Sequence, residues 1–412
     1  MKAMLNVDLA FRKLRDLVRP VDETERVTLD DAIGRIAAES VAAPTDLPPF
    51  DASAMDGYAV DATGLDHSTE KRFEVIDESL AGRPASSTLS APRHAIRVFT
   101  GAAMPDGATA VVLQEDAVRQ GDTMITNAPV HRDQHVRHLG HDVRRGSRLC
   151  CRGTRLSHFH LAWFAACGIE EVTVSRRVRV GVFSTGDELA DRGTPLKTGQ
   201  IYDSNRFAIT SLLREKAVET FDLGCIRDDP NLIASSLDKA SRNTDLIVTS
   251  GGVSVGDADY VKEAVARIGR IEFWKIALKP GKPLAIGRVR HALFFGLPGN
   301  PVSAIVTYLL FVAPTIDRLG GHEPTPPLTL TAAMDRKVRH SVGRREYLRG
   351  TLRSSDGQLV VTPTGDQGSN RLATFAGANC LVVVDEDKGD VGVGESVDVI
   401  LLPDEGAHLM HS

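Results

Sequence analysis

The spacing of apolar residues near the start of the chain predicts two helices. Apolar positions between Leu9 and Val18 recur at helical spacing, and Pro20 then ends the first helix. Asp30 is a candidate N-cap for a second helix, with Ile33 and Ile36 on its inner side.

The pattern changes to short strands from about residue 50 to 139. Apolar runs at 58–60, 73–76, 95–99 and 110–113 lie between Gly, Pro and Asp clusters, which is typical of a small all-β module. A helical pattern returns at 155–167. We therefore predict one helical or linker domain, elongated and formed by residues 1–46 and 140–176, which a β-rich module of residues 47–139 interrupts.

Strands and helices alternate from residue 177 to 323, which predicts an α/β domain with a mainly parallel sheet. The expected strands are 178–183, 245–249 and 293–295, and the expected helices are 205–216, 259–268 and 302–319. The proline-rich segment at 323–327 reads as a linker to a C-terminal β domain of residues 324–412.

Three loops that follow strands of the α/β domain carry glycines and polar groups. They are Ser184–Glu188, Thr249–Asp259 and Leu297–Pro301. Ligands of parallel sheets bind beyond the carboxyl ends of the strands, and Gly-rich loops let backbone N–H groups approach an anion. One such loop would more simply be a turn, but three in succession favour a ligand site.

Charged residues near these loops suggest anion and metal binding. Lys275, Lys279 and Lys282 lie within eight positions, which indicates an anion receptor, although a solvated loop is the alternative. Glu188, Asp228 and Asp259 offer the oxygen ligands that Mg²⁺ prefers, with helix capping and turn formation as the alternative for the aspartates.

Composition narrows the class of protein. The chain has 412 residues, 42% of them hydrophobic, and a net charge of −5, so nucleic acid and anionic membranes are not the expected partners. The five cysteines show no metal or disulfide spacing. The most apolar stretch, residues 304–313, is shorter than the about 20 residues of a membrane span. We expect a cytoplasmic protein with reduced thiols.

Eight motifs, in order, resemble those of the molybdopterin molybdenumtransferase family, which is related to the gephyrin E-domain. They are PPFDASAMDGYAV, FTGAAMPDGA, VFSTGDEL, GQIYDSN, TSGGVSVGDADY, ALKPGKP, GLPGNPVSA and TGDQGSNRL. The resemblance covers about residues 5–405. It implies an elongated four-part protomer of α/β plus β class, with a C-terminal domain resembling a β-barrel. It also implies a homodimer whose active site lies between the α/β domain of one subunit and the β module of the other.

The resemblance implies the last step of molybdenum cofactor synthesis. Adenylylated molybdopterin and molybdate would give molybdenum-molybdopterin and AMP, with Mg²⁺ as cofactor and other proteins of this pathway as further partners. The catalytic residues it implies are Asp56, Thr100, Glu188, Asp228, Asp259, Lys275 and Lys279, of which Glu188, Asp228 and Asp259 lie near Mg²⁺. The substrate-binding residues it implies are Thr249, Ser250, Gly251, Gly252, Ser254, Lys282, Pro298, Pro301, Arg344 and Ser369. Arg349 is either a further contact or a surface residue, and the role of Asp142 is open.

Two other functions fit the same residues. The α/β domain also resembles the enzyme that adenylylates molybdopterin. Relatives of this fold also organise other proteins, so a scaffold that binds the cofactor without catalysis is the other alternative. The extra β domains favour metal insertion over adenylylation, and the set of carboxylates and lysines argues against a scaffold. The sequence does not separate molybdate from tungstate, because that choice depends on the size of the oxyanion pocket.

Overall fold

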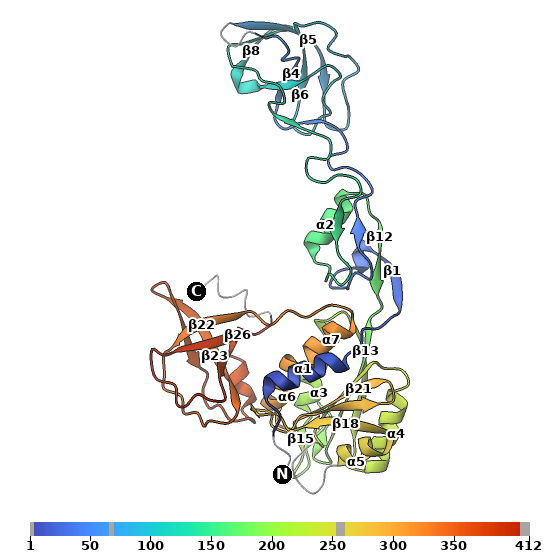
Figure 1. Cartoon of the computed structure of the whole chain (residues 1–412), viewed down its shortest axis with the longest axis vertical. Helices are drawn as coiled ribbons and strands as arrows, with labels where there is room; N and C mark the ends of the chain where they lie inside the picture. The colour runs from blue at the N-terminus through green and yellow to red at the C-terminus, as the bar shows by residue number, and fades with distance from the viewer. Residues whose placement is uncertain (1–3, 66–69, 253–259, 404–412) are drawn as a thin grey trace. The chain divides into compact units, whose positions relative to one another are not determined.

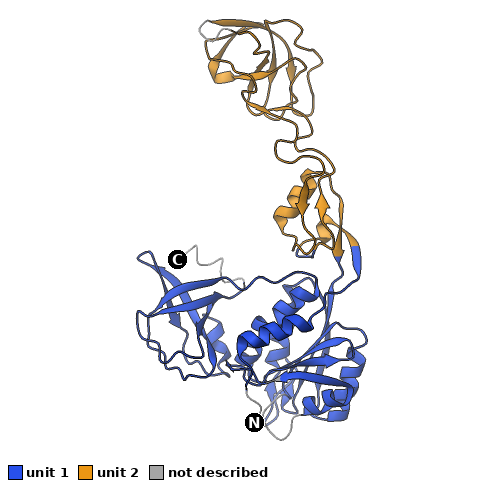
Figure 2. Ribbon diagram, viewed as in Figure 1, with its two compact units in different colours: residues 1–25, 34–36, 175–412 blue, residues 26–33, 37–174 orange. Residues whose placement is uncertain are grey.

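The computed structural model describes residues 4–65, 70–252 and 260–403. The chain forms two compact units (Figure 2), and each is described by itself. Unit 1 comprises residues 1–25, 34–36 and 175–412, and unit 2 comprises residues 26–33 and 37–174. This division is coarser than the four predicted domains, whose boundaries remain a prediction.

The centre of unit 1 is a six-stranded sheet in the order β16-β13-β17-β21-β20-β18 (Figure 1). The first four of these strands are parallel, and β20 and β18 run antiparallel to their neighbours. The strands are β13 (Val178–Thr185), β16 (Val218–Ile226), β17 (Leu246–Ser250), β18 (Gly269–Trp274), β20 (Ala285–Val289) and β21 (Ala292–Leu297). Because β13 lies between the strands that follow it in the chain, the sheet has a topological switch point between β13 and β17.

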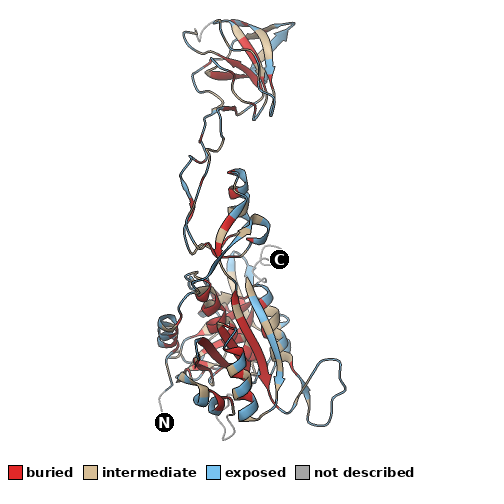
Figure 3. Ribbon diagram, turned by 90° about the vertical axis from the view of Figure 1, so that its right-hand side faces the viewer, coloured by how far each residue is buried: buried red, intermediate tan, exposed pale blue. Residues whose placement is uncertain are grey.

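Helices cover both faces of this sheet, and the buried strands lie between them (Figure 3). On one face, α3 (Ser204–Arg214) and α6 (Pro301–Thr307) share a core with α1 (Val7–Leu17). On the other face lie α4 (Pro230–Ala240) and α5 (Tyr260–Ile268). The short strands β14 (Leu189–Ala190) and β15 (Ile201–Tyr202) pair with each other before α3. The predicted α/β arrangement is confirmed.

A long apolar helix belongs to this core. A π-helical segment (Tyr308–Val312) joins α6 to α7 (Ala313–Leu319), which gives one run of 19 residues, as the pattern predicted. By length and composition Pro301–Leu319 could cross a membrane, but 67% of its apolar window is buried inside the fold. Its burial against the sheet accounts for its apolar sequence without a membrane.

The predicted helix after Asp30 is wrong. Only a 3₁₀ turn forms, at Leu29–Asp31. Gly34 has φ of +71°, in the left-handed region, so a right-handed helix cannot continue through it. Ala37 then pairs with Val174 as an isolated bridge.

The C-terminal part of unit 1 is a closed β-barrel. Its strands follow the order β23-β24-β22-β26-β25, and β25 pairs back onto β23. They are β22 (Thr329–Met334), β23 (Arg345–Ser355), β24 (Gln358–Pro363), β25 (Cys380–Val384) and β26 (Ser396–Leu401), with a 3₁₀ turn at Leu372–Phe375. The two-residue strand β19 (Leu278–Lys279) belongs to the lysine-rich loop, residues 275–282. It pairs with Arg345 and Glu346 at the start of β23, before the part of β23 that pairs with β24. The predicted C-terminal domain is therefore confirmed as a barrel.

Unit 2 contains the predicted β module. Its six-stranded sheet has the order β7-β4-β6-β5-β9-β8. The strands are β4 (Gly57–Val60), β5 (Lys71–Ser79), β6 (His94–Val98), β7 (Ala110–Leu113), β8 (Ala117–Gln120) and β9 (Thr123–Thr126), with a 3₁₀ turn at Gln114–Asp116. Beside it, β3 (Ala52–Ser53) pairs with β10 (Val136–Arg137).

A second hydrophobic cluster of unit 2 lies around Phe164 and Val174. The elements around it are β1 (Thr24–Thr28), β2 (Val41–Ala42), β11 (Arg148–Cys150), α2 (His158–Ala166) and β12 (Glu171–Ser175). The predicted helix at 155–167 is thus present, three residues shorter at its start.

We expect Asp77→Asn to change how the stability of the β module depends on pH. Backbone N–H groups of Glu78 and Ser87 donate to the Asp77 carboxylate at 2.8 and 2.9 Å and lower its pKa to about 2. Because the pKa is lowered on folding, this stabilisation is complete above the pKa of the unfolded chain, about 4. It disappears as the pH falls toward the pKa of the folded protein, about 2. The difference in thermal stability between the two proteins should therefore shrink between pH 4 and 2.

The control is Asp106→Asn, which removes the same charge from an exposed position of the same module. Thermal unfolding followed from pH 7 to pH 2 tests the expectation. A stability difference for Asp77→Asn that stays constant over this range would contradict it.

Candidate active site at the switch point of the sheet

The carboxyl ends of β13 and β17 lie side by side at the switch point. Phe183 pairs with Thr249 and Ser184 with Ser250, so the loops that begin at Thr185 and Gly251 start at the same level of the sheet. The structure thereby brings together two of the three predicted loops. In parallel sheets this crevice is the usual ligand site.

Two glycines allow these loops to touch. Gly251 has φ of +91°, and a Cβ on it would lie 2.5 Å from the carbonyl oxygen of Thr185. Gly252 has φ of +66°, and its Cβ would lie 2.3 Å from Cγ2 of Val261 and 2.7 Å from Oγ1 of Thr185. A side chain at either position would both strain the backbone and force the loops apart.

Two buried hydroxyl groups near these glycines have no partner among the residues that the structure describes. Oγ1 of Thr185 and Oγ1 of Thr249 are buried and have no hydrogen-bond partner within the described part of the chain. Buried polar atoms are nearly always hydrogen-bonded in proteins, so an unpaired pair at one crevice indicates groups that a ligand can satisfy. Thr249 was among the predicted residues, whereas Thr185 was not.

The third predicted loop is joined to the second by Asn205, which the sequence prediction did not select. Its Nδ2 donates to Oγ of Ser250 at 2.8 Å and to the carbonyl of Gly299 at 2.7 Å. Ser250 in turn donates to the carbonyl of Pro298 at 3.3 Å. The only sequence signal for Asn205 was its place in the GQIYDSN motif, since its partners lie 45 and 94 positions away.

Asn205→Ala should lower the stability of unit 1 by about 1–2 kcal/mol, because it removes two hydrogen bonds that hold the loops together. The matched control is Asn231→Ala, also in the first turn of a helix, whose exposed side chain accepts one bond from Arg267. Denaturant unfolding of both variants measures the difference. Equal losses of stability in the two variants would contradict the role of Asn205.

Three carboxylates gather beyond β13 and β16. The backbone N–H of Asp228 donates to Oδ1 of Asp187 at 3.4 Å. Burial, followed by the charges of Asp187 and Glu188, raises the pKa of Asp228. Glu188 folds back over Gly186, where a Cβ would lie 2.5 Å from Oε2 of Glu188. Glu188 and Asp228 are thus together as predicted, and Asp187 was missed.

The cluster of three carboxylates, Asp187, Glu188 and Asp228, suits a hard cation. Oxygen donors of like charge that repel one another are stabilised when a divalent ion binds between them. Asp259 and Ser254 lie outside the described residues, and the described residues alone contain no group of three His, Cys, Asp or Glu side chains arranged as a metal site. Asp229 instead caps α4, accepting bonds from the N–H groups of Asn231 and Leu232.

The lysine-rich loop runs between α6 and the barrel. A Cβ on Gly281 would lie 2.6 Å from Cγ2 of Thr307, so the loop lies tightly on the end of α6. Lys275 has φ of +69°, and its carbonyl accepts the N–H of Leu5. Lys282 is exposed. Lys279, on β19, forms an ion pair with Glu346 at 2.8 Å.

The barrel carries Ser369 to the α/β domain. The N–H of Val302 donates to the carbonyl of Ser369 at 3.1 Å, so Ser369 lies at the start of α6, beside Pro301. Arg344 lies in the turn before β23 and is half-buried. The structure thus brings Ser369 to the predicted loop at Pro301, whereas Arg344 stays a prediction from the resemblance.

The interpretation of Arg349 as a surface residue is wrong, because its side chain is fully buried. Its guanidinium donates to Oγ1 of Thr374 at 3.0 Å and to the carbonyls of Gln367 and Gly368 at 3.3 and 3.2 Å. Burial lowers the pKa of Arg349. Arg349 therefore holds the loop that carries Ser369.

Asp56 and Thr100, two of the residues that the resemblance implies, lie together in unit 2. The N–H and Oγ1 of Thr100 donate to Oδ1 of Asp56 at 2.8 and 2.9 Å. These two bonds lower the pKa of Asp56, so it is a carboxylate at neutral pH. The pair offers a fixed negative charge on the β module.

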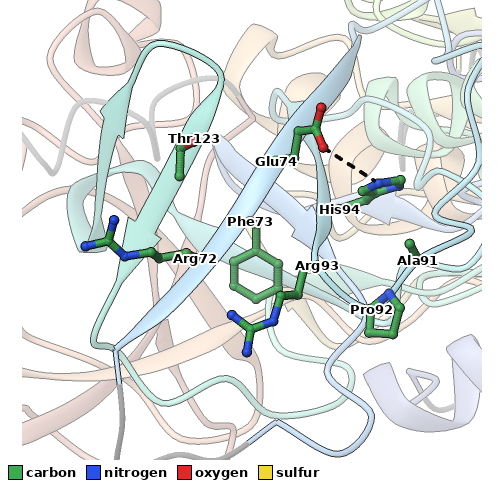
Figure 4. A pocket seen from close by; sticks show the side chains of 8 residues that line it. All are labelled: Arg72, Phe73, Glu74, Ala91, Pro92, Arg93, His94 and Thr123. Atoms are coloured by element: carbon green, nitrogen blue, oxygen red, sulfur yellow. Dashed lines mark ion pairs between the residues drawn. The ribbon is translucent and has the colours of Figure 1, made fainter.

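A cavity of about 630 Å³ lies elsewhere in the β module (Figure 4). It lies beside β5 and β6, and Nε2 of His94 lies 4.0 Å from Oε2 of Glu74 at its wall. Its lining residues are Arg72, Phe73, Glu74, Ala91, Pro92, Arg93, His94 and Thr123. No predicted site residue is among them, so this cavity is separate from the candidate site.

Three family models match consecutive parts of the chain. Residues 5–168 match the "MoeA N-terminal region (domain I and II)", residues 181–318 a "Probable molybdopterin binding domain", and residues 331–402 the "MoeA C-terminal region (domain IV)". Together these matches run through both units.

Similar proteins carry consistent names. The chain is 39% identical to a molybdopterin molybdenumtransferase of Haemophilus influenzae, over 96% of this chain and 98% of that protein. It is 36% identical to one of Nostoc, over 92% and 89%. A crystal structure of a molybdopterin biosynthesis MoeA protein from Pyrococcus horikoshii superposes with a TM-score of 0.83 at 28% identity, covering 97% of this chain and all of the other.

These matches extend over almost the whole chain, and their order is that of the motifs and of the folded parts. The chain therefore belongs to the molybdopterin molybdenumtransferase family.

Proposed function

We propose that the chain inserts molybdenum from molybdate into adenylylated molybdopterin and releases AMP. The observation that carries this proposal is the crevice between β13 and β17 near Gly251 and Gly252, where two buried hydroxyls have no partner within residues 4–65, 70–252 and 260–403. Such a site accepts phosphate oxygens, and the family relationship points to the pterin as the group attached to them. A transferase of molybdenum cofactor biosynthesis is the function that both support.

The nucleotide end of the substrate would lie on the rim formed by Thr249, Ser250, Gly251 and Gly252. Backbone N–H groups at a glycine turn donate to phosphate oxygens. The hydroxyls of Thr185 and Thr249, which have no partner in the described part of the chain, would donate to the same oxygens. Pro298 and Pro301 would form the wall of the pocket. Asn205 would keep the second and third loops at a fixed spacing before the substrate binds.

Mg²⁺ would be held by Glu188 and Asp228, with Asp187 nearby. When bound, the ion would neutralise phosphate charge as the phosphoanhydride bond between pterin phosphate and AMP is hydrolysed. Burial and the two neighbouring negative charges raise the pKa of Asp228. A bound cation would relieve this repulsion and stabilise the ionised carboxylate. Asp259, which lies outside the described residues, completes the proposed set.

Molybdate would be held by cations and a hydroxyl from the lysine-rich loop and the barrel. Lys275, Lys279 and Lys282 would balance its two negative charges in a protein whose net charge is −5. Arg344 and Ser369 are the proposed contacts from the barrel. No covalent protein intermediate is required, because positioning and charge stabilisation are sufficient for this transfer.

We propose further that the protein acts as a cytoplasmic homodimer, in which Asp56 and Thr100 of one copy serve the site of the other copy. Mixing two inactive variants tests this arrangement. Asp56→Asn and Asp228→Asn proteins, mixed and allowed to exchange subunits, should regain about a quarter of the activity if each site takes residues from two copies, because random exchange makes half of the molecules mixed dimers with one intact site. Failure to recover activity despite proven exchange would contradict it.

The activity itself is tested with purified protein, adenylylated molybdopterin, molybdate and Mg²⁺. Molybdenum-molybdopterin and AMP should form in equal amounts. Incubation with ATP and molybdopterin separates the alternative, since adenylylated product would indicate an adenylyltransferase. Substrate binding without turnover in either assay would indicate a scaffold, and both of these outcomes would overturn the proposal.

A further inference from the structure

Lys279 pairs with a buried glutamate that a buried histidine contacts in turn, and both of these residues lie outside the set of predicted site residues. The register of β19 and β23 places Lys279 directly opposite the first of them, Glu346. Nζ of Lys279 lies 2.8 Å from Oε1 of Glu346, whose side chain is only 4% exposed, whereas that of Lys279 is 43% exposed. The ammonium group is thus anchored at its buried side and open at the other.

The second oxygen of Glu346 is also occupied. Nδ1 of His340 lies 2.7 Å from Oε2 of Glu346, and the imidazole is 1% exposed. A carboxylate oxygen only accepts, so Nδ1 carries the proton of this bond. The backbone N–H of His340 donates to Oδ1 of Asp390 at 3.1 Å, which fixes the position of the histidine itself. Nε2 of His340 has no partner in the described part of the chain.

We propose that Glu346 and His340 are positioning residues for Lys279. With both oxygens engaged, the Glu346 carboxylate cannot rotate away, so it holds the ammonium group in one place. An ammonium group has three donors, and two of them remain free for an oxyanion on the exposed side. A flexible lysine would otherwise lose its side-chain freedom only when the anion binds, which weakens binding.

This inference rests on the proposed function only where it concerns molybdate. An ion pair at a strand junction could also serve stability alone. Both roles predict a more reactive Lys279 once Glu346 is replaced, because the ammonium group loses its carboxylate partner in either case. Only positioning predicts that molybdate then binds more weakly. The test therefore uses one measurement without substrate and one with it.

The first measurement is acetylation by N-acetoxysuccinimide, followed residue by residue by mass spectrometry of the full-length folded protein. Lys282, exposed in the same loop, is the internal control. In Glu346→Gln we expect the ratio of the Lys279 rate to the Lys282 rate to rise at least about fivefold, because the anchor of the ammonium group is lost. An unchanged ratio would overturn the proposal. Opening of the whole loop would give that result, because it would raise the rates of both lysines equally.

The histidine supplies a second set of variants that keeps the test usable if Glu346→Gln folds poorly. His340→Leu removes the donor to Glu346, and we expect about a twofold to threefold rise in the same ratio. His340→Gln restores a donor and should return the ratio toward that of the unmodified protein. Identical ratios in the two histidine variants would show that His340 does not act through Glu346.

The second measurement is the kinetics of molybdenum insertion. Glu346→Gln should raise KM for molybdate about tenfold and change kcat less than about threefold, since it loosens a binding group. In a Lys279→Met background the same substitution should have no further effect on KM. Additive effects in the two backgrounds would overturn positioning, whereas absence of any insertion by the unmodified protein would reject only the proposed function.

Discussion

Asp228→Asn should lower the rate of molybdenum insertion by at least about 100-fold, which corresponds to about 2.7 kcal/mol of transition-state stabilisation. The Asp228 carboxylate is half-buried beside Asp187 and Glu188. An amide of the same shape removes one of the negative charges that would attract Mg²⁺, and it offers one weak oxygen ligand in place of a carboxylate. The effect should appear as a higher Mg²⁺ requirement together with a lower maximal rate.

Stability should move in the opposite direction to activity. Replacing Asp228 relieves repulsion among three carboxylates, so the variant should unfold at the same temperature as the unmodified protein or a slightly higher one when no Mg²⁺ is present. Thermal unfolding with and without Mg²⁺ measures this. Stabilisation by the ion should be clear in the unmodified protein and much weaker in the variant.

The neighbouring residue provides a matched control. Asp229 caps α4 through its side chain, and asparagine caps helices as well as aspartate does. Asp229→Asn therefore removes the same charge one position away and should retain at least about half of the activity. If Asp228→Asn were as active as Asp229→Asn, the cluster of Asp187, Glu188 and Asp228 would not be the metal site.

Gly251→Ala should abolish binding at the switch point, with a loss of at least about 100-fold in affinity for the adenylylated substrate or for AMP. A Cβ at this position would lie 2.5 Å from the carbonyl oxygen of Thr185, which is backbone and cannot rotate away. The φ of +91° adds strain of about 1–3 kcal/mol for any residue with a side chain. The loops would separate, and the N–H groups of the rim would no longer converge.

Gly299→Ala is the control within the same site. Among the described residues, a Cβ on Gly299 would meet only Cα of Gly251, at 3.8 Å, an ordinary van der Waals contact. The backbone of Gly299 lies outside the left-handed region, so an alanine fits there without strain. This variant should bind AMP within about threefold of the unmodified protein. Calorimetric titration compares the two, and equal affinities would contradict a special role for Gly251.

The architecture of the chain followed from its sequence to a large extent. The buried strands β13, β17 and β21 and the apolar helix from Pro301 to Leu319 were predicted close to their observed limits, because runs without polar residues occur only where both faces of an element are covered. The edge strand β16 was not predicted. Its residues are only partly buried or exposed, so it lacks the apolar run that marked the central strands.

The rim of the site was also predictable, since a glycine loop after each parallel strand places polar groups at one edge of the sheet. The residues that were missed have another origin. Thr185, Asp187 and Asn205 gain their roles from neighbours on other strands and loops, as Asn205 does through Ser250 and Gly299. Their local pattern marks them only as members of a loop or a motif, and does not show which neighbour each side chain contacts. Likewise Arg349 is an arginine in a strand pattern, and only the closed barrel shows that it is buried.

The order of the motifs and the alternation of strands and helices along the chain determined the family and the α/β plus β class, because both are encoded in local spacing. The pairing of β19 with β23 was decided only by the tertiary structure. It turns a loop lysine into the partner of a buried glutamate that lies 67 positions further along. Such contacts depend on how parts of the chain that are distant in sequence pack together. The free energy that selects them comes from burial across the whole fold and not from the residues adjacent in sequence.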